Sequence, residues 1–379
     1  MVALMLSYFI SLTQHIRGEK LNWRKVAVLP GESATVESLG YAGVIAGIEK
    51  DYLIVSGGAN FPKELPWKGG EKKFYRSSFV FKILKSGLKF LGRYDNLSIP
   101  IAYAASCNTR HGVFFAGGEN EKGPSAMAGL IRLNHIGAAP EIVPLPALPM
   151  PLSNAMAVCK GDQVFLAGGE NTDSTLSGFY TLDLNHIEKG WIELPPLPKP
   201  VSHFVFLSIN VAGSEQLFLI GGRTKIKNAP TLFYRDVFSY NLRLKQWEIK
   251  APLPYPLAAG TGATFNDHTL LVMGGDKGIR YNQVEKVLLE IKNEKDSEKI
   301  QQLNEHRIQL QETHPGFSKE MLAYDWTADK WLSSGDFPFD MPVTTRLVQR
   351  KDRFFLVSGE IRAGIRTPNI YSGLSTTSH

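Results

Sequence analysis

The sequence has little cysteine: 379 residues include two, Cys107 and Cys159. Two cysteines exclude a disulfide-rich scaffold and a four-cysteine zinc site, so two unpaired thiols are expected. The nine histidines never occur in the His-Glu-x-x-His spacing of a catalytic zinc helix. We therefore predict a protein that works without a metal ion and without a cofactor.

The sequence also has no strong excess of charge of one sign. Its 42 Lys and Arg residues against 36 Asp and Glu residues give a net charge of +6. The basic residues are scattered, the one densely charged stretch (286–307) is of mixed sign, and no nucleic-acid-binding motif accompanies them. A nucleic-acid partner is therefore not expected.

No apolar run is long enough to span a bilayer. The N-terminal stretch MVALMLSYFISL has the length of a signal-peptide core, although no Lys or Arg precedes it and no small-x-small cleavage site follows. We expect residues 1–20 to be a signal peptide or leader and the protein to be periplasmic or secreted. The alternative is a disordered leader on a cytoplasmic protein.

What the sequence does contain is a repeat. Six times an apolar run of strand type ends at a pair of small residues, and successive pairs lie roughly 50–60 residues apart except for the last. The pairs are Gly57-Gly58, Gly117-Gly118, Gly168-Gly169, Gly221-Gly222, Gly274-Gly275 and Ser358-Gly359.

Each repeat has the same internal order. A turn and a strand of small apolar residues precede the glycine-ending run, two further strands follow it, and a proline-rich connector such as LPPLPKP (194–200) leads to the next unit. Four short strands per unit are typical of a propeller blade. The sequence therefore predicts an all-β fold, a six-bladed β-propeller over residues 21–379.

An aromatic pair follows the glycines in several repeats. Tyr240 and Trp247 lie seven residues apart, as do Tyr324 and Trp331. A Gly-Gly pair followed by Tyr and then Trp resembles the Kelch repeat, and the resemblance covers about residues 21–374. It implies that the fold is a six-bladed Kelch-type β-propeller.

The two ends of the chain are expected to close the ring, because an open propeller would expose unpaired strand edges. The sixth repeat has Tyr371 after its glycine, but the chain stops before a strand with tryptophan. A strand with a tryptophan, Trp23, occurs instead at residues 21–29. We predict that this segment pairs with residues 369–374 as the outer strand of the last blade.

The longest interval between glycine pairs contains an insertion, residues 276–320. It is rich in Glu, Lys, Leu and Gln, and Val284, Val287, Leu288 and Ile291 have helical spacing. We predict one helical insertion between the second and third strands of the fifth blade. Its role is either a wall over a pocket or a peripheral arm that could form a homodimer.

The residues just after the glycine pairs are expected to converge on one face, around the central channel. Asn60, Glu119, Glu170 and Arg223 are the candidates for substrate binding there, together with Glu360. The alternative is an ordinary set of solvated propeller loops.

Three segments extend the resemblance. They are SGEIRAGIRTP (358–368), GGANFP (57–62) and the insertion that ends in LAYDWTADKW. Together they resemble the sialic acid mutarotases, the N-acetylneuraminate epimerases of Kelch type, in a cyclically permuted branch, since the blade with the glutamate is last here. The resemblance implies that Glu360 is the proton acceptor and Arg366 its partner, and that the substrate is a small sugar acid.

The chemistry of mutarotation suits these residue types. Ring opening of a 2-keto sugar acid removes a proton from the anomeric hydroxyl and adds one to the ring oxygen, which a carboxylate can exchange. An arginine can bind the carboxylate of such a substrate. We therefore expect an isomerase that interconverts the anomers of N-acetylneuraminate or a related sugar acid.

Other interpretations stay open. Glu360 and Arg366 could form a structural clasp of the loop, and the propeller could be a non-catalytic module that binds a protein or a glycan. A sialidase is disfavoured because its repeated Ser-x-Asp-x-Gly-x-Thr-Trp motifs are absent. A copper radical oxidase of Kelch type is also disfavoured, because it would need a cysteine–tyrosine site with histidine ligands and the sequence does not suggest one.

Overall fold

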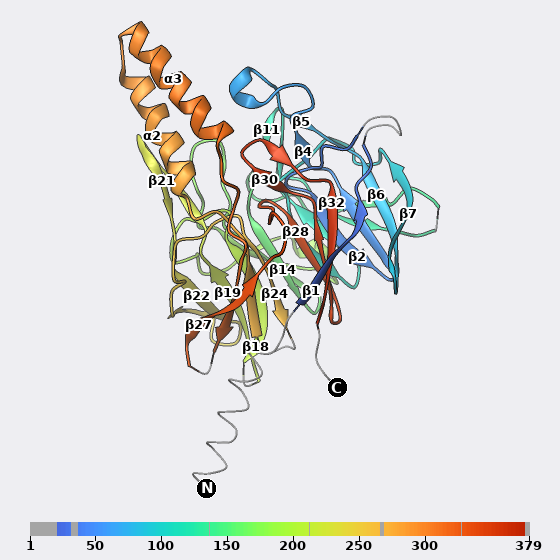
Figure 1. The fold of residues 1–379 in the computed structure, drawn as a ribbon. Helices are drawn as coiled ribbons and strands as arrows, with labels where there is room; N and C mark the ends of the chain where they lie inside the picture. The colour runs from blue at the N-terminus through green and yellow to red at the C-terminus, as the bar shows by residue number, and fades with distance from the viewer. Residues whose placement is uncertain are drawn as a thin grey trace.

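The computed structural model describes residues 21–31, 37–135, 137–211, 213–265, 269–326 and 328–375. Its strands form six four-stranded antiparallel sheets, arranged as the blades of a β-propeller (Figure 1). The predicted six-bladed all-β architecture is confirmed. The predicted leader, residues 1–20, lies outside the described residues, so the periplasmic or secreted location stays a prediction.

In the order of blades one to six, the innermost strands are β2 (Ile45–Glu49), β8 (Ala105–Thr109), β14 (Met156–Lys160), β18 (Val205–Val211), β24 (Thr261–Phe265) and β28 (Arg346–Arg350). The second strands are β3 (Tyr52–Ser56), β9 (Gly112–Ala116), β15 (Gln163–Ala167), β19 (Ser214–Ile220), β25 (Thr269–Met273) and β29 (Arg353–Val357). The third strands are β6 (Ser78–Leu84), β12 (Ala128–Arg132), β16 (Phe179–Asp183), β22 (Val237–Asn241), β26 (Glu320–Asp325) and β32 (Asn369–Ser375). The outermost are β7 (Gly87–Tyr94), β13 (Glu141–Pro144), β17 (Ile192–Glu193), β23 (Gln246–Lys250), β27 (Lys330–Asp336) and β1 (Leu21–Val28).

The ring closes through β1, which pairs antiparallel with β32 in the last blade. Trp23 lies opposite Gly373, as Trp247 lies opposite Tyr240 in the fourth blade. The predicted closure and the place of Trp23 are confirmed. The tyrosine expected beside it is not Tyr371: that position is taken by Gly373, where a Cβ atom would lie 2.9 Å from the Trp23 indole.

Tryptophans in or directly before the outer strands link neighbouring blades by hydrogen bonds. The indole N–H of Trp191 donates to the Pro146 carbonyl (3.0 Å), and that of Trp331 donates to the Ala251 carbonyl (2.9 Å). In each case the acceptor lies in the connector that follows the outer strand of the preceding blade. Between the sheets, buried aliphatic and aromatic side chains fill one apolar cluster per interface, and this burial is the main source of stability.

The first residue of each glycine pair has a positive φ, which favours glycine. Ser358 occupies this position in the sixth blade with φ 53°, where a side chain is strained. Its hydroxyl compensates by accepting a hydrogen bond from the Tyr41 backbone N–H (2.8 Å) and donating one to the Thr367 carbonyl (2.7 Å). These two bonds hold the loop 358–368 against the first blade's entry segment.

Short hairpins follow the glycine pairs on one face of the propeller. They are β4–β5 (Ala59–Asn60, Lys73–Phe74), β10–β11 (Glu119–Asn120, Gly123–Pro124), β20–β21 (Arg223–Ile226, Ala229–Phe233) and β30–β31 (Glu360–Arg362, Ile365–Arg366). The 3₁₀ helix η1 (Pro66–Lys68) lies in the loop of the first of them, and a second, η2 (Ile187–Lys189), precedes β17. The hairpins labelled in Figure 1 all lie on the face from which the two helices project.

The insertion between β25 and β26 contains α2 (Ile279–Asn293) and α3 (Ser297–Glu312). Asp296 begins α3 by accepting hydrogen bonds from the backbone N–H groups of Glu298 and Lys299. Helix α2 is fastened to the β20–β21 hairpin, since the carboxylate of Glu285 accepts from the Thr231 N–H (2.6 Å) and hydroxyl (3.0 Å). The helices are thereby held over the same face as the short hairpins.

Candidate functional site

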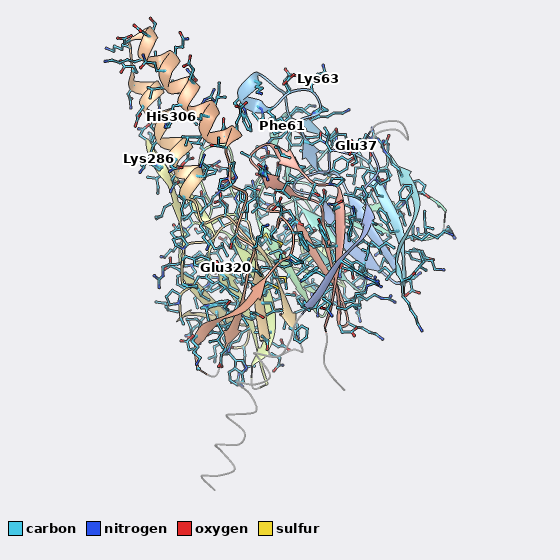
Figure 2. All side chains as sticks on the ribbon, in the orientation of Figure 1. Glu37, Phe61, Lys63, Lys286, His306 and Glu320 are labelled. Atoms are coloured by element: carbon cyan, nitrogen blue, oxygen red, sulfur yellow. The ribbon has the colours of Figure 1, made fainter. Side chains whose placement is uncertain are left out.

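A cavity of about 480 Å³ opens on this face at the end of the central channel. Its lining combines side chains that follow the glycine pairs with others from η1, α2 and the residues after α3. Figure 2 shows Phe61, which belongs to this lining, on the side of the propeller from which the helices with Lys286 and His306 project. A cavity of this size is typical of small-molecule sites. We call it the site cavity.

Backbone geometry places the residue after each glycine pair at an equivalent point of the rim. Each makes two backbone hydrogen bonds with the segment that enters its own blade, for example Glu119 with Ala102 and Glu360 with Val343. The residues so held are Ala59, Glu119, Glu170, Arg223, Asp276 and Glu360. Their side chains therefore start from a rigid ring of six positions, and five of them are charged.

Glu360 and Arg366 face each other across the β30–β31 hairpin, which explains their spacing of six. The Arg366 Nη2 atom lies 3.1 Å from the Glu360 Oε2 atom, and the side chains are 4% and 20% exposed. The other carboxylate oxygen of Glu360 accepts from the Gly364 N–H (2.9 Å). The Arg366 guanidinium also lies over the Phe61 ring, 4.6 Å from its centroid.

Arg366 has unused hydrogen-bonding capacity. Its Nε and Nη1 atoms are buried and have no hydrogen-bond partner among the residues that the structure describes. A buried, unpaired donor is costly to leave unsatisfied. Because Arg366 lines the site cavity, an anionic or polar ligand in this cavity could satisfy these donors.

The floor of the site cavity is a closed ring of backbone hydrogen bonds. One residue from the entry segment of each blade donates its N–H to the carbonyl of the corresponding residue in the preceding blade. In ring order these residues are Gly43, Tyr103, Asn154, His203, Ala259 and Thr344, all with positive φ. Five of the six are not glycine, so the floor is held in a strained conformation by the surrounding blades.

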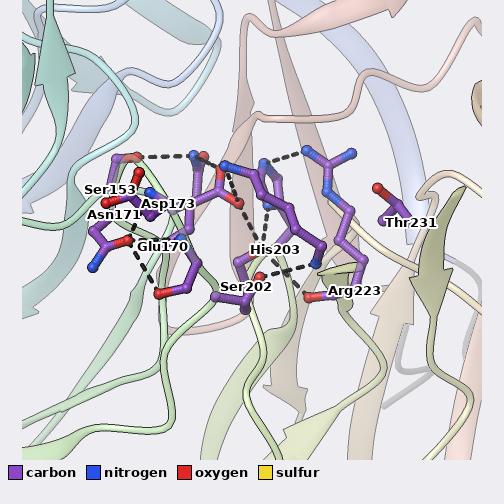
Figure 3. Close-up of polar contacts among 12 residues, drawn as sticks. Ser153, Glu170, Asn171, Asp173, Ser202, His203, Arg223 and Thr231 are labelled. Atoms are coloured by element: carbon purple, nitrogen blue, oxygen red, sulfur yellow. Dashed lines mark hydrogen bonds and ion pairs between the residues drawn. The ribbon is translucent and has the colours of Figure 1, made fainter. Parts of the chain in front are cut away.

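A hydrogen-bonded chain runs along one side of this floor (Figure 3). Arg223 Nη2 donates to His203 Nε2 (3.2 Å), so His203 Nδ1 carries the proton and donates to the Ser202 hydroxyl (3.0 Å). That hydroxyl lies 3.4 Å from the buried carboxylate of Glu170, which also accepts from Asn154 (2.9 Å). Burial, together with Arg223, Lys225 and Arg346, holds the pKa of His203 well below its usual value, so this imidazole is neutral at physiological pH.

Glu119 lies on the other side, between blades one and three. Lys72 Nζ is 3.3 Å from one of its oxygens and the Ser153 hydroxyl is 3.3 Å from the other. Burial lowers the pKa of Lys72, but Tyr103 and Glu119 outweigh it, so the net shift is upward. Lys72 is therefore a cation on the cavity wall at neutral pH.

Asp276 lies between Arg223 and Glu360 in the ring of six rim positions. Burial raises the pKa of its carboxyl, and the charge of Glu360 adds to this, against the lowering effects of the Gly278 N–H and Arg223. Its Oδ1 atom accepts from the Gly278 backbone N–H (2.8 Å). Asp276 is thus a carboxyl group whose ionised form is disfavoured in the folded protein.

The helical insertion supplies the wall opposite η1. Tyr281 lies against the Arg223 guanidinium, whose carbon is 4.7 Å from the ring centroid. Burial, aided by Arg280 and Arg362, lowers the pKa of His314 to about 4, so this side chain is neutral. An ion pair between Lys68 of η1 and Glu312 of α3 (2.9 Å) joins the two sides above the cavity.

The structure brings together Glu119, Glu170, Arg223, Glu360 and Arg366 in the lining of one cavity. Asn60 is different. It is not in this lining, and its amide is used internally: it donates to the Gly40 carbonyl (2.9 Å) and accepts from the Tyr75 hydroxyl (2.8 Å). The equivalent rim position in the first blade is Ala59, one residue earlier.

Several lining residues were not predicted from the sequence, among them Tyr103, Asn154, His203 and Tyr281. The first three occupy the same place in their repeats, just before the strand that lines the channel. A comparison of all six entry segments could have found them, since AYA, SNA and SHF align there.

Among the described residues, no three His, Cys, Asp or Glu side chains gather in a metal-binding arrangement. No helix of this part of the chain is long and apolar enough to cross a bilayer.

Comparison with known proteins gives one family. The N-acetylneuraminate epimerase family matches residues 145–378. Curated proteins named N-acetylneuraminate epimerase from Escherichia coli (strain K12) and Shigella flexneri are 26% identical over 231 residues, which covers 60% of this chain and 59% of each relative. A protein of the same name from Shigella sonnei (strain Ss046) matches equally well. The matched segment therefore covers less than two thirds of the relatives' length.

Proposed function

The chain belongs to the N-acetylneuraminate epimerase family, and from this membership we propose that it is a sugar mutarotase. The proposed substrate is N-acetylneuraminate or a related 2-keto sugar acid, and the proposed reaction interconverts its α and β anomers. The observation that carries the proposal is the Glu360–Arg366 pair, in which a carboxylate and a partly unpaired buried guanidinium border one cavity.

In the proposed reaction, Glu360 accepts the proton of the anomeric hydroxyl. The anomeric carbon–ring oxygen bond then breaks, the carbonyl of the open-chain ketone forms, and the ring oxygen takes a proton to become a free hydroxyl. Rotation of the carbonyl followed by the reverse steps closes the ring on the other face. The protons balance if Glu360 returns the one that it accepted, a role for a carboxylate that commonly accelerates a reaction by about 10²–10⁴.

Arg366 would hold the substrate in place while Glu360 accepts and returns the proton. One of its N–H groups is committed to Glu360, and Nε and Nη1 are left for the substrate carboxylate or the oxyanion that develops during ring opening.

The remaining polar groups of the site cavity suit a ligand with many hydroxyl groups. Glu119 and Glu170 are acceptors, Arg223 and Lys72 are donors, and the neutral imidazole of His203 is fixed in one tautomer by its neighbours. Sugar hydroxyls can donate and accept hydrogen bonds, so they can satisfy both kinds of group. This lining supports a sugar acid over an apolar ligand.

Exchange NMR with N-acetylneuraminate tests the proposal. Glu360→Gln keeps the shape of the side chain but cannot accept the proton, so we expect anomer exchange to fall by about 10²–10⁴ while binding is largely retained. Glu121→Gln, at an exposed position outside the cavity lining, is the matched control. Exchange at the wild-type rate in Glu360→Gln would reduce the pair to a structural clasp and favour a non-catalytic binding propeller.

A further inference from the structure

A second, smaller space lies along the channel below the floor of the site cavity. It has a volume of about 40 Å³, and we call it the channel chamber. Tyr103, Asn154, His203, Ala259 and Thr344 line both the site cavity and the chamber, so the ring of backbone hydrogen bonds separates the two. Its other end is bordered by Met156 and Arg346, which also line a wide cavity at the opposite mouth of the channel.

Arg346 crosses the channel. It belongs to the innermost strand of blade six, yet its Nη2 atom donates to the Ala104 carbonyl in blade two, and its Nη1 atom lies 3.7 Å from the Met156 sulfur in blade three. Its Nε atom is buried and has no hydrogen-bond partner among the described residues. Two of its five N–H groups thus have partners, one of them only a weakly accepting thioether.

The positive charge of Arg346 has no counterion among the described residues that line the chamber. None of the residues that line the chamber is an aspartate or a glutamate, and its other titratable side chains are Tyr103 and His203. Burial lowers the pKa of Arg346 to about 10, which leaves it charged at neutral pH. A buried cation without a counterion is costly, and a small anion would offset that cost.

We propose that the channel chamber is a binding site for a single monovalent anion of halide size, held by the guanidinium of Arg346. The volume suits a small ion or water rather than an organic acid. Three side-chain donors of its lining already have acceptors: Asn154 donates to Glu170, His203 donates to Ser202, and Thr345 donates to the Val357 carbonyl. The anion site is independent of the sugar chemistry, because the backbone ring lies between the two spaces.

The anion would act as a structural ligand of the ring. Arg346 contacts three blades, so a bound anion that fixes its guanidinium also fixes the centre of the propeller. A ligand that binds only the folded state stabilises it by mass action. We expect the melting temperature in chloride or bromide to exceed that in gluconate, which is too large for the chamber, at equal ionic strength. Above the dissociation constant the gain should be about 1–3 °C for each tenfold rise in halide.

Two measurements on the full chain test this site. In crystals grown with sodium bromide, an anomalous peak is expected in the chamber beside the Arg346 guanidinium. In thermal unfolding, Arg346→Met should abolish the halide dependence. Arg350→Met, a change at the half-buried far end of the same strand, where the side chain pairs with Asp51, should retain it. Arg366→Met should also retain it, which distinguishes the chamber from any anion bound in the site cavity.

Each outcome decides the proposal. Equal melting temperatures in chloride and gluconate, or a chamber that contains only water in the bromide crystals, would overturn it. If Arg346→Met does not fold, the bromide crystals of the wild-type protein still give the answer. Sugar exchange is not a readout here, so the failure of the anion site and the failure of the mutarotase proposal are separate results.

Discussion

At the scale of single residues, the hairpin structure of the loop explains why Glu360 and Arg366 lie six residues apart in the sequence. The spacing of six brings the two side chains together because the segment forms a hairpin in which these positions are opposite each other. The pair is mostly buried, so it differs from an exposed ion pair, which would contribute only about 0–1 kcal/mol. Its unpaired N–H groups point to a ligand as the missing partner.

Replacement of Arg366 tests that interpretation. Arg366→Lys keeps the charge but loses the planar fork and the Nε and Nη1 donors, so we expect the dissociation constant for N-acetylneuraminate to rise about tenfold or more. A titration followed by NMR measures it. Arg362→Lys is the matched control, since Arg362 belongs to the same hairpin but is exposed. An equal and small effect of both changes would contradict a role for Arg366 in binding.

Asp276 gives a prediction about pH. Its pKa is raised in the folded protein, so its ionised form destabilises the fold above that pKa, and the penalty decreases as the pH falls toward the unfolded value of about 3.9. Asp276→Asn should therefore raise the melting temperature at pH 7, and the difference from wild type should vanish near pH 4. The exposed residue Asp173 provides the control Asp173→Asn. A difference that grows at acidic pH would show that the sign is wrong.

At the scale of elements, the repeat made most of the site predictable. Glycine pairs mark where the second strand of each blade ends, so the charged residues after them were expected on one face, and Glu119, Glu170 and Arg223 lie there. Asn60 does not line the cavity because alternate residues of a strand point to opposite sides, and in the first blade the rim position is Ala59. The predicted residue, Asn60, is thus one position beyond the residue that occupies the rim, and its side chain points away from the cavity.

The floor of the site cavity was harder to predict. Its six residues share a positive φ but no residue type, and five are not glycine, so neither composition nor a glycine pattern marks them. Their conformation is imposed by the closed ring of backbone hydrogen bonds, which exists only when all six blades are assembled. Non-local constraint of this kind is not present in any single repeat.

The helical insertion is the element whose function is easiest to test. Because Tyr281, Glu285 and His314 line the site cavity, replacing residues 279–314 by a short Gly/Ser linker should leave the propeller folded and weaken sugar binding about tenfold or more. Calorimetry and exchange NMR measure the two effects. Glu312→Gln, which removes only the exposed Lys68 pair, should have little effect. Unchanged affinity without the helices would make them a peripheral arm.

At the scale of the whole molecule, the position of the closing strand makes the N-terminal segment part of the last blade. Strand β1 lies on the outer edge of the sheet that it forms with β32, β29 and β28, although it is more than 300 residues away in sequence. This pairing joins the two ends of the chain across one blade, so the ring depends on a contact that forms only after the last strand is made. The half-buried Trp23 is also packed against Phe337 in the connector from blade five, with ring centroids 5.0 Å apart.

Removal of β1 should therefore open the ring. We expect deletion of residues 1–29 to expose the edge of β32 and to broaden the unfolding transition. The melting temperature should fall by about 5–10 °C, the shift that a loss of about 5 kcal/mol or slightly more causes in a chain of this length. Deletion of residues 1–20, which leaves β1 in place, is the matched control and should melt like the full chain. Differential scanning calorimetry measures both midpoint and cooperativity, and size-exclusion chromatography detects association through the exposed strand edge. If the 1–29 deletion melts at the same temperature and as cooperatively as the control, β1 contributes nothing to closure, and five complete blades with a three-stranded sixth are sufficient for a stable ring.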